Sequence, residues 1–224
     1  MITIVRCGKW RFSSGLRAMA LMGAALLGGC ALAAVGTEPA PDLYVLTAVT
    51  PEVPAGVADT AWQILIEEPY APAEINTNRI VYRPDVNQLS YYADARWTDR
   101  APQIVQRLMV ETLENTGKFL SVGRRSGGLR SDFALTSDLR MFEAEPGNGL
   151  AAPKIRVKIS TKLVRQRGNQ IVASRVFDAE AVAQSGQMPA VVRAFDAALH
   201  QVLGEMAVWT LTEVHRVAGN GVGG

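Results

Sequence analysis

A strictly alternating segment at 154–163 constrains the fold of this chain more than any other feature. Its apolar positions are Ile155, Val157, Ile159 and Leu163, and its basic positions are Lys154, Arg156, Lys158 and Lys162. Successive side chains of a strand point to opposite faces, so this pattern predicts a strand with one face on the core and one toward water or a partner. Gly168 and Asn169 then favour a tight turn into 171–183. We therefore expect a long antiparallel hairpin.

The rest of the sequence predicts an α+β domain. Further strands are expected at 43–47, 62–67, 79–83, 89–93, 119–122 and 132–143, and helices at 101–116 and 189–215. Pro84, Asp85 and Asn87 favour a turn that would join two of these strands as a hairpin. Apolar residues recur at three- or four-residue spacing through both helices. We expect a single domain whose mostly antiparallel sheet carries two main helices packed on one face.

The first 29 residues have the composition of a targeting segment. Four basic residues precede a ten-residue apolar stretch at 18–27, whereas a helix across a bilayer needs about 20 apolar residues. The segment ends in Leu27-Gly28-Gly29-Cys30, which resembles the bacterial lipobox. That resemblance implies that Cys30 receives diacylglycerol and, after cleavage in front of it, a further acyl chain. A secreted protein cut near Ala34 and an uncleaved anchor are the alternatives.

These features divide the chain into four predicted parts. They are a lipoprotein signal peptide at 1–29, a lipidated tether at 30–41, a folded domain at 42–215 and a flexible glycine-rich tail at 216–224. Cleavage removes Cys7 and lipid occupies Cys30, so the domain has no disulfide and depends on its core for stability. The mature chain has 19 Lys and Arg against 21 Asp and Glu, a balance that argues against a nucleic-acid partner.

The sequence offers few groups for catalysis. His200 and His215 are fifteen residues apart on one predicted helix, about 22 Å, so they cannot share a metal ion. Glu143 and Glu145 form a candidate acid pair, but they end a predicted strand beside a turn and are expected to be solvated. Nucleophile-elbow and phosphate-loop motifs are absent from the sequence. We predict a non-enzymatic protein with no catalytic residue, no metal site and no cofactor beyond the lipid on Cys30.

Two groups of residues are candidates for binding a partner or lipid. The first is the basic face of the alternating segment, formed by Lys154, Arg156, Lys158 and Lys162, which suits anionic headgroups or an acidic protein. The alternative is a solvated sheet face or a lysine-protected edge. The second group is Tyr82, Tyr91, Tyr92 and Trp97, with arginines among them. Tyrosine, tryptophan and arginine anchor many interfaces, but they are also ordinary core and sheet residues.

The order of several short motifs resembles one protein family. The motifs are Leu43-Tyr44-Val45-Leu46 after Cys30, Arg79–Tyr82, Leu89–Tyr92, Arg96-Trp97, the helix at 102–113, Gly117-Lys118-Phe119, Val191–Leu199 and Trp209. Each is degenerate alone, but together they span nearly the whole mature chain. In this order and spacing they resemble the ABC-type transport auxiliary lipoproteins, which include the paraquat-inducible C-component lipoproteins. Val45 departs from the second tyrosine that many members carry.

This resemblance implies a role in the cell envelope. Members look like accessory parts of MCE-domain transport systems, which move phospholipids or other hydrophobic molecules between membranes. The implied partners are an MCE-domain protein, an ABC permease and a separate ATPase, and a homo-oligomer stays open. Ala31 after Cys30 favours the outer membrane by resemblance to enterobacterial lipoproteins, with the domain facing the periplasm. An independent lipid-binding or structural envelope lipoprotein is the alternative function.

Overall fold

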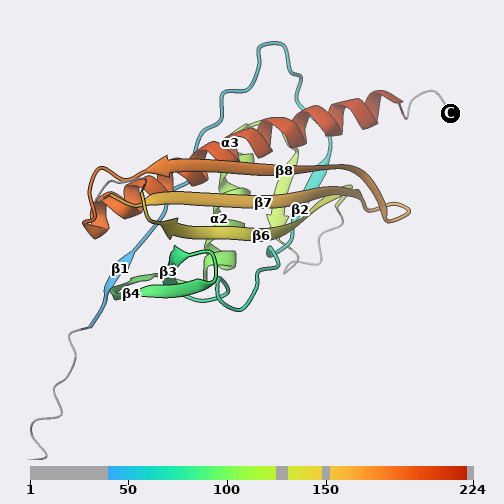
Figure 1. Cartoon of the computed structure of the whole chain (residues 1–224). Helices are drawn as coiled ribbons and strands as arrows, with labels where there is room; N and C mark the ends of the chain where they lie inside the picture. Colours follow the sequence, from blue (N-terminus) through green and yellow to red (C-terminus); the bar gives the residue numbers. More distant parts are fainter. Residues whose placement is uncertain (1–39, 125–130, 148–151, 221–224) are drawn as a thin grey trace, which may run out of the picture. The chain divides into compact units, whose positions relative to one another are not determined.

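The alternating segment forms the middle strand of a long three-stranded antiparallel ribbon. In the computed structural model, which describes residues 40–124, 131–147 and 152–220, β7 (Lys154–Arg165) pairs with β6 (Phe133–Glu145) and β8 (Gln170–Val182) (Figure 1). The β7–β8 turn uses positive φ angles of 84° at Gly168 and 49° at Asn169, as expected for a tight hairpin. The predicted hairpin is confirmed.

Two smaller groups of strands share the other edge of β6. The start of β6 pairs with β2 (Gln63–Ile66), which also pairs with β5 (Ser121–Arg124). The end of β6 pairs with β3 (Arg79–Asp85), which continues through β4 (Gln88–Trp97) to β1 (Asp42–Tyr44). The eight strands therefore form one sheet that divides along a single edge of β6.

The expectation of a mostly antiparallel sheet is wrong, because the sheet is mixed. Four of the seven strand pairings between described residues are parallel: β1–β4, β2–β5, β2–β6 and β3–β6. The antiparallel pairings join strands that follow one another in the chain, and the sequence pattern predicted two of them, β3–β4 and β7–β8, as hairpins. The parallel pairings join strands separated by other elements, and alternation within a strand carries no information about that choice.

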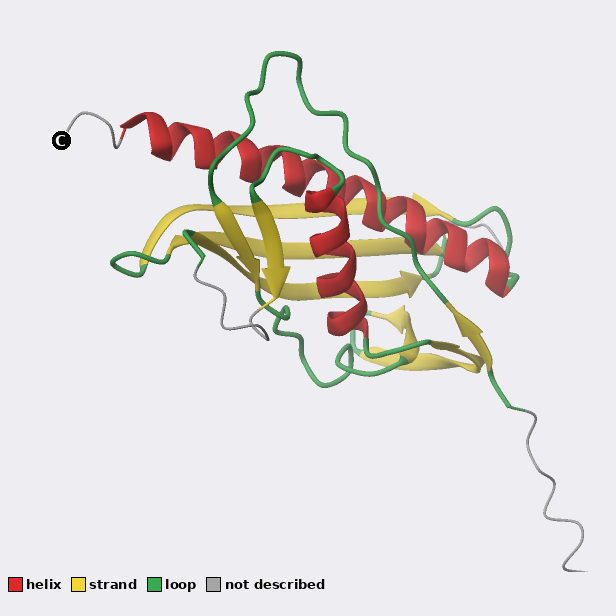
Figure 2. Cartoon of the chain, turned by 180° about the vertical axis from the view of Figure 1, so that it is seen from behind, coloured by secondary structure: helices red, strands yellow, loops and turns green. Residues whose placement is uncertain are grey.

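Both helices described by the structure pack on the same face of the sheet, as predicted (Figure 2). They are α2 (Ala101–Glu114), with a proline in its first turn, and α3 (Met188–Asn220). The helix α3 continues beyond the predicted end at His215, so residues 216–220 are helical and not tail; residues 221–224 lie outside the described residues. Between helices and sheet, the rings of Trp97, Phe142 and Phe195 meet with centroids 5.1–5.7 Å apart.

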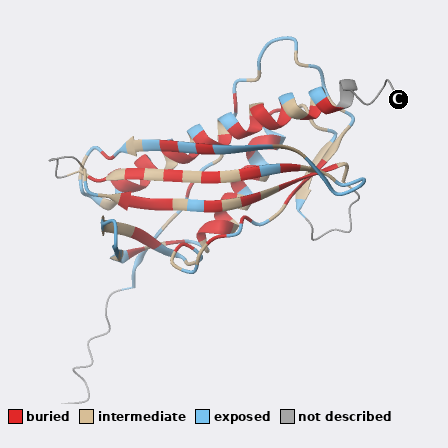
Figure 3. Ribbon diagram, turned by 45° about the vertical axis from the view of Figure 1, so that its right-hand side comes forward, coloured by how far each residue is buried: buried red, intermediate tan, exposed pale blue. Residues whose placement is uncertain are grey.

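A β-bulge in β6 determines which side chains reach the open face of the sheet. The register against β7 shifts between Leu139 and Met141. The core side chains of β6 are therefore at odd-numbered positions before the shift and at even-numbered positions after it. Phe142 consequently stays in the core, while Glu143 and Glu145 project from the face without helices. The alternating burial along β6 and β7 is visible in Figure 3.

Candidate functional site

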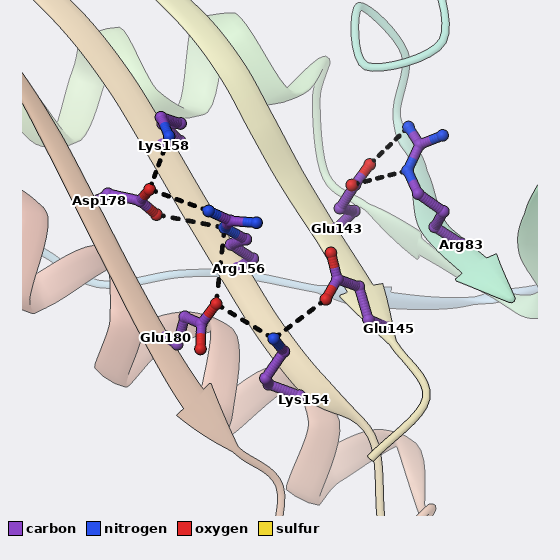
Figure 4. A network of polar contacts seen from close by, with 8 residues as sticks. All are labelled: Arg83, Glu143, Glu145, Lys154, Arg156, Lys158, Asp178 and Glu180. Carbon is purple, nitrogen blue, oxygen red and sulfur yellow. Dashed lines mark hydrogen bonds and ion pairs between the residues drawn. The ribbon is translucent and has the colours of Figure 1, made fainter. Parts of the chain in front are cut away.

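The predicted basic face of β7 lies on the open face of the sheet, where acidic residues of neighbouring strands surround it (Figure 4). Lys154 Nζ lies 3.2 Å from Glu145 Oε2 and 3.1 Å from Glu180 Oε1. Arg156 Nη2 and Lys158 Nζ lie 3.1 and 2.8 Å from Asp178 Oδ2. The hydrogen bonds to Glu180 and Glu145 raise the pKa of Lys154, and the hydrogen bond from Arg156 lowers the pKa of Asp178.

This network removes most of the positive charge that the sequence suggested. The residues drawn in Figure 4 are four cations (Arg83, Lys154, Arg156 and Lys158) and four anions (Glu143, Glu145, Asp178 and Glu180). Lys162 differs, because it is exposed and has no ion pair with any residue that the structure describes. The eight-residue network is therefore neutral, and Lys162 is the one basic candidate of β7 that it does not include.

A separate ion pair, with a buried glutamate, joins β3 to β6 beside these contacts. Arg83 donates from Nε and Nη2 to Glu143 Oε1 and Oε2, at 2.7 and 2.8 Å. The Glu143 side chain is 2% exposed, in contrast to the solvated position expected, and the Arg83 side chain is 27% exposed. Paired hydrogen bonds of this geometry are among the strongest in proteins. The glutamate raises the pKa of Arg83, and the pair fixes β3 against β6.

The four aromatic candidates do not form one surface. Trp97 is 1% exposed and lies in the core, so it packs the fold and offers no surface to a partner. Tyr82 and Tyr92 contact each other with ring centroids 5.7 Å apart and are partly buried against the core. Burial, with a smaller contribution from Tyr82, raises the pKa of Tyr92 to about 12. Tyr91 remains accessible in part, with the exposed Arg79 guanidinium 3.5 Å from its ring centroid.

Sequence reasoning missed a clamp that holds the segment after β1 against α3. The Thr47 N–H and Oγ1–H donate to Asp196 Oδ1 and Oδ2, at 2.8 and 2.7 Å. His200 Nε2 lies 3.0 Å from the Thr47 carbonyl oxygen and 2.9 Å from Thr47 Oγ1. The other histidine of the chain, His215, places Nε2 3.0 Å from the Ala58 carbonyl oxygen. Both histidines thus fasten one segment, 47–58, which we call the strap.

An open groove lies between the strap and α3. It has a volume of about 810 Å³ and is lined by Val49–Glu52 of the strap, by Arg175 of β8, and by His200, Gln201, Gly204, Glu205, Val208, Trp209, Thr212 and Glu213 of α3. Figures 1 and 2 show the strap arching past α3 between its two ends. His200 and His215, for which the sequence predicted no shared metal site, therefore hold one wall of a groove.

Other predicted features lie partly outside the structure. Cys30, the predicted lipid attachment site, falls outside the described residues, as does the predicted signal peptide. Within the described ranges, three or more His, Cys, Asp or Glu side chains nowhere gather in a way that would hold a metal ion. In the same ranges, neither helix is long and apolar enough to cross a membrane.

The fold and these surfaces define an α+β domain that presents an ion-paired sheet face and an open groove to its surroundings. The profile of the ABC-type transport auxiliary lipoprotein component family matches residues 44–207. The chain belongs to this family, and the resemblance drawn from its motifs is confirmed.

One protein sequence and two solved structures are similar to this chain. An uncharacterized protein of Bradyrhizobium diazoefficiens is 30% identical over 152 residues, a match that spans 67% of this chain and 40% of the relative. The crystal structure of a DUF330-family protein from Xanthomonas campestris superimposes with a TM-score of 0.74 and 30% identity, covering 80% of this chain and 99% of that chain. A second crystal structure, of an uncharacterized protein, covers 75% of this chain and 97% of that chain with a TM-score of 0.57; at 18% identity it shows the fold alone.

Proposed function

We propose that this auxiliary lipoprotein is a membrane-tethered docking subunit of an ABC-type transport system that includes an MCE-domain protein. In this proposal the system moves phospholipids or other hydrophobic molecules across the cell envelope, and a separate permease and ATPase supply the path and the energy. Family membership carries the proposal, because the matched residues 44–207 include nearly all of the folded domain. The chain itself contributes position and binding and no chemistry.

The tether supports a positional role. Each buried methylene contributes about 0.8 kcal/mol to membrane binding, and two or more acyl chains hold a protein firmly where one does not. Eleven residues lie between Cys30 and Asp42, and the fully extended chain from one to the other spans about 40 Å. Lipidation of Cys30, which we place in the outer membrane, would therefore keep the domain close to that membrane on its periplasmic side.

The surface chemistry favours a protein partner over anionic lipid headgroups. Three of the four basic candidates on β7 already have carboxylate partners, which leaves Lys162 as the uncompensated one. Among the aromatic candidates, Tyr91 with Arg79 stacked on it is the pair that a partner can reach. We propose Tyr91 and Lys162 as peripheral contacts; the other candidates maintain the fold and its charge balance.

One observation favours the alternative, an independent lipid-binding lipoprotein. The groove beside α3 has a volume of about 810 Å³, within the range of small-molecule sites, and parts of its floor are apolar. Its openness to solvent and its acidic side chains argue for a polypeptide occupant. Lipid analysis of the purified full-length protein distinguishes the docking subunit from the independent lipid carrier. An independent carrier retains stoichiometric lipid in addition to the lipid on Cys30.

Transport can be tested by measuring lipid distribution in cells. Cells that lack this chain are complemented with the wild type or with Cys30→Ser, and phospholipids of the separated inner and outer membranes are quantified by mass spectrometry. We expect deletion to change the distribution, the wild type to restore it, and Cys30→Ser to fail at equal protein level. A distribution that is unchanged by deletion, under conditions where loss of the MCE-domain protein changes it, would contradict the proposal.

A further inference from the structure

We propose that the groove between the strap and α3 binds a segment of a partner protein that carries apolar side chains and at least one lysine or arginine. This inference rests on the docking role proposed above and assigns that role to a particular surface. Three observations support it. The strap, which forms the wall of the groove, is hydrogen-bonded to α3 at both ends. The floor, which α3 forms, contains a glycine with open space above it, and the side chains at the rim carry excess negative charge.

The wall of the groove is held against α3 by polar contacts at both ends of the strap. Asp196 accepts two hydrogen bonds from Thr47, and the single nitrogen His200 Nε2 contacts two oxygens of the same residue. Eleven residues further along the strap, His215 Nε2 lies 3.0 Å from the Ala58 carbonyl oxygen. The groove is thus preorganised, which lowers the conformational cost of binding.

Gly204, which lacks a side chain, leaves the groove deeper at its position on α3. It lies in the interior of α3, a 33-residue helix, where glycine is one of the least favourable residues. A Cβ atom built at Gly204 would meet no heavy atom within 4 Å, so packing inside this chain does not require glycine there. Its φ angle is not positive either, so backbone conformation does not require it. Close approach of another molecule to the helix backbone is a use of glycine that fits this position.

The floor around Gly204 suits an elongated apolar segment. Val208, one helical turn further along, is half-buried, and Val49 of the strap faces the groove from the wall. Lining residues extend along α3 from His200 to Glu213, about 20 Å at the rise of an α-helix. This length accommodates about 13 residues of a helix or six of an extended chain.

The rim determines the charge of the occupant. Glu52, Glu205 and Glu213 line the groove against the single permanent cation Arg175. Arg216 Nη2 lies 2.7 Å from Glu213 Oε2, and Arg175 Nη2 lies 4.0 Å from Glu205 Oε2. Glu52 has no ion-pair partner within the described part of the chain. An acidic rim disfavours anionic phospholipid headgroups and favours lysine or arginine beside the apolar contacts.

Photochemical crosslinking in the native envelope tests this assignment. A benzophenone side chain replaces Gln201, which is exposed and lines the groove, in the full-length lipidated protein, and crosslinked peptides are identified by mass spectrometry. We expect an apolar peptide containing Lys or Arg from an MCE-domain protein or another transporter subunit. Gly204→Leu, which places a bulky side chain on the floor of the groove where the occupant approaches the helix backbone, should lower its yield at least tenfold. Gly204→Ala is the matched control and should retain the yield, because one methyl group leaves most of the groove open.

Further outcomes separate this inference from the proposed function. Both glycine variants should keep a thermal midpoint at or above that of the wild type, so a loss of crosslinking is not a loss of fold. The double variant Glu52→Lys/Glu205→Lys should also lower the yield at least tenfold. An apolar and basic peptide from an envelope protein outside any transporter would support the groove and contradict the transport role. Crosslinks to acyl chains, to a second copy of this chain, or at a yield that Gly204→Leu leaves unchanged would overturn the inference.

Discussion

Replacing Arg83 with alanine should destabilise the domain far more than replacing Arg156, because the carboxylate partner of Arg83 is buried and those of Arg156 are not. The substitution leaves the Glu143 carboxylate, 2% exposed, without its two hydrogen-bond donors. Breaking a buried ion pair by removing one partner costs about 3–5 kcal/mol. The Arg83 side chain is itself 27% exposed, so water can enter the vacated space and the lower end, about 3 kcal/mol, is expected.

Calorimetric unfolding of the purified full-length protein measures this cost. A loss of about 3 kcal/mol corresponds to a decrease in thermal midpoint of about 6–12 °C for a chain of this size. Arg156→Ala is the control, because its partners Asp178 and Glu180 are 31% and 47% exposed and such pairs contribute about 1 kcal/mol or less. Adding Glu143→Gln to Arg83→Ala should recover part of the loss by removing the buried charge. Equal midpoints for Arg83→Ala and Arg156→Ala would refute the argument that burial sets the cost.

Three further predictions concern other parts of the domain. Trp97→Ala should cost about 3–5 kcal/mol in urea unfolding, as expected for a core aromatic, whereas Tyr91→Ala should cost less than about 1.5 kcal/mol. Because burial raises the pKa of Tyr92 from its usual 10 to about 12, folding stability should fall between these pH values, and Tyr92→Phe should reduce that fall in alkaline urea titrations. Because Arg156 lowers the pKa of Asp178 below 3.8, the stability that this carboxylate contributes should be lost as pH falls through the lowered value, and Asp178→Asn should flatten the acid limb of the unfolding curve.

The local elements of the fold were predictable because each depends on nearby residues. Strand alternation at 154–163, the Gly168–Asn169 turn and the apolar spacing of both helices all correspond to elements at nearly the expected positions. The direction of the long-range pairings was not predictable, because β2 and β3 select the same edge of β6 through contacts far apart in the sequence. The β6 bulge, which places Glu143 on the open face, likewise leaves no mark in the alternation alone.

The charge pairing on the open face depends on a register shift that local pattern does not reveal. Lys158 lies opposite Asp178 and Arg156 opposite Glu180 because the β7–β8 register shifts between Leu163 and Val164. Pairing outward from the Gly168 turn without that shift would place Lys158 opposite Phe177, so neither the turn nor the basic count on one strand predicts the ion pairs. The strap was not predictable either, because Thr47 and His200 are 153 residues apart and local pattern cannot predict their contact. A glycine within a long apolar helical repeat was the one signal of the groove.

The proposed docking role is tested most directly by identifying what the lipidated protein retains. The protein is purified from its own envelope in gentle detergent, and everything retained is identified by mass spectrometry. We predict recovery of an MCE-domain protein with permease and ATPase components, at levels that fall when Tyr91 and Arg79 are both replaced by alanine. Recovery of the lipoprotein alone, fully lipidated and without transporter components, would contradict the account and favour a structural or independent lipid-binding role.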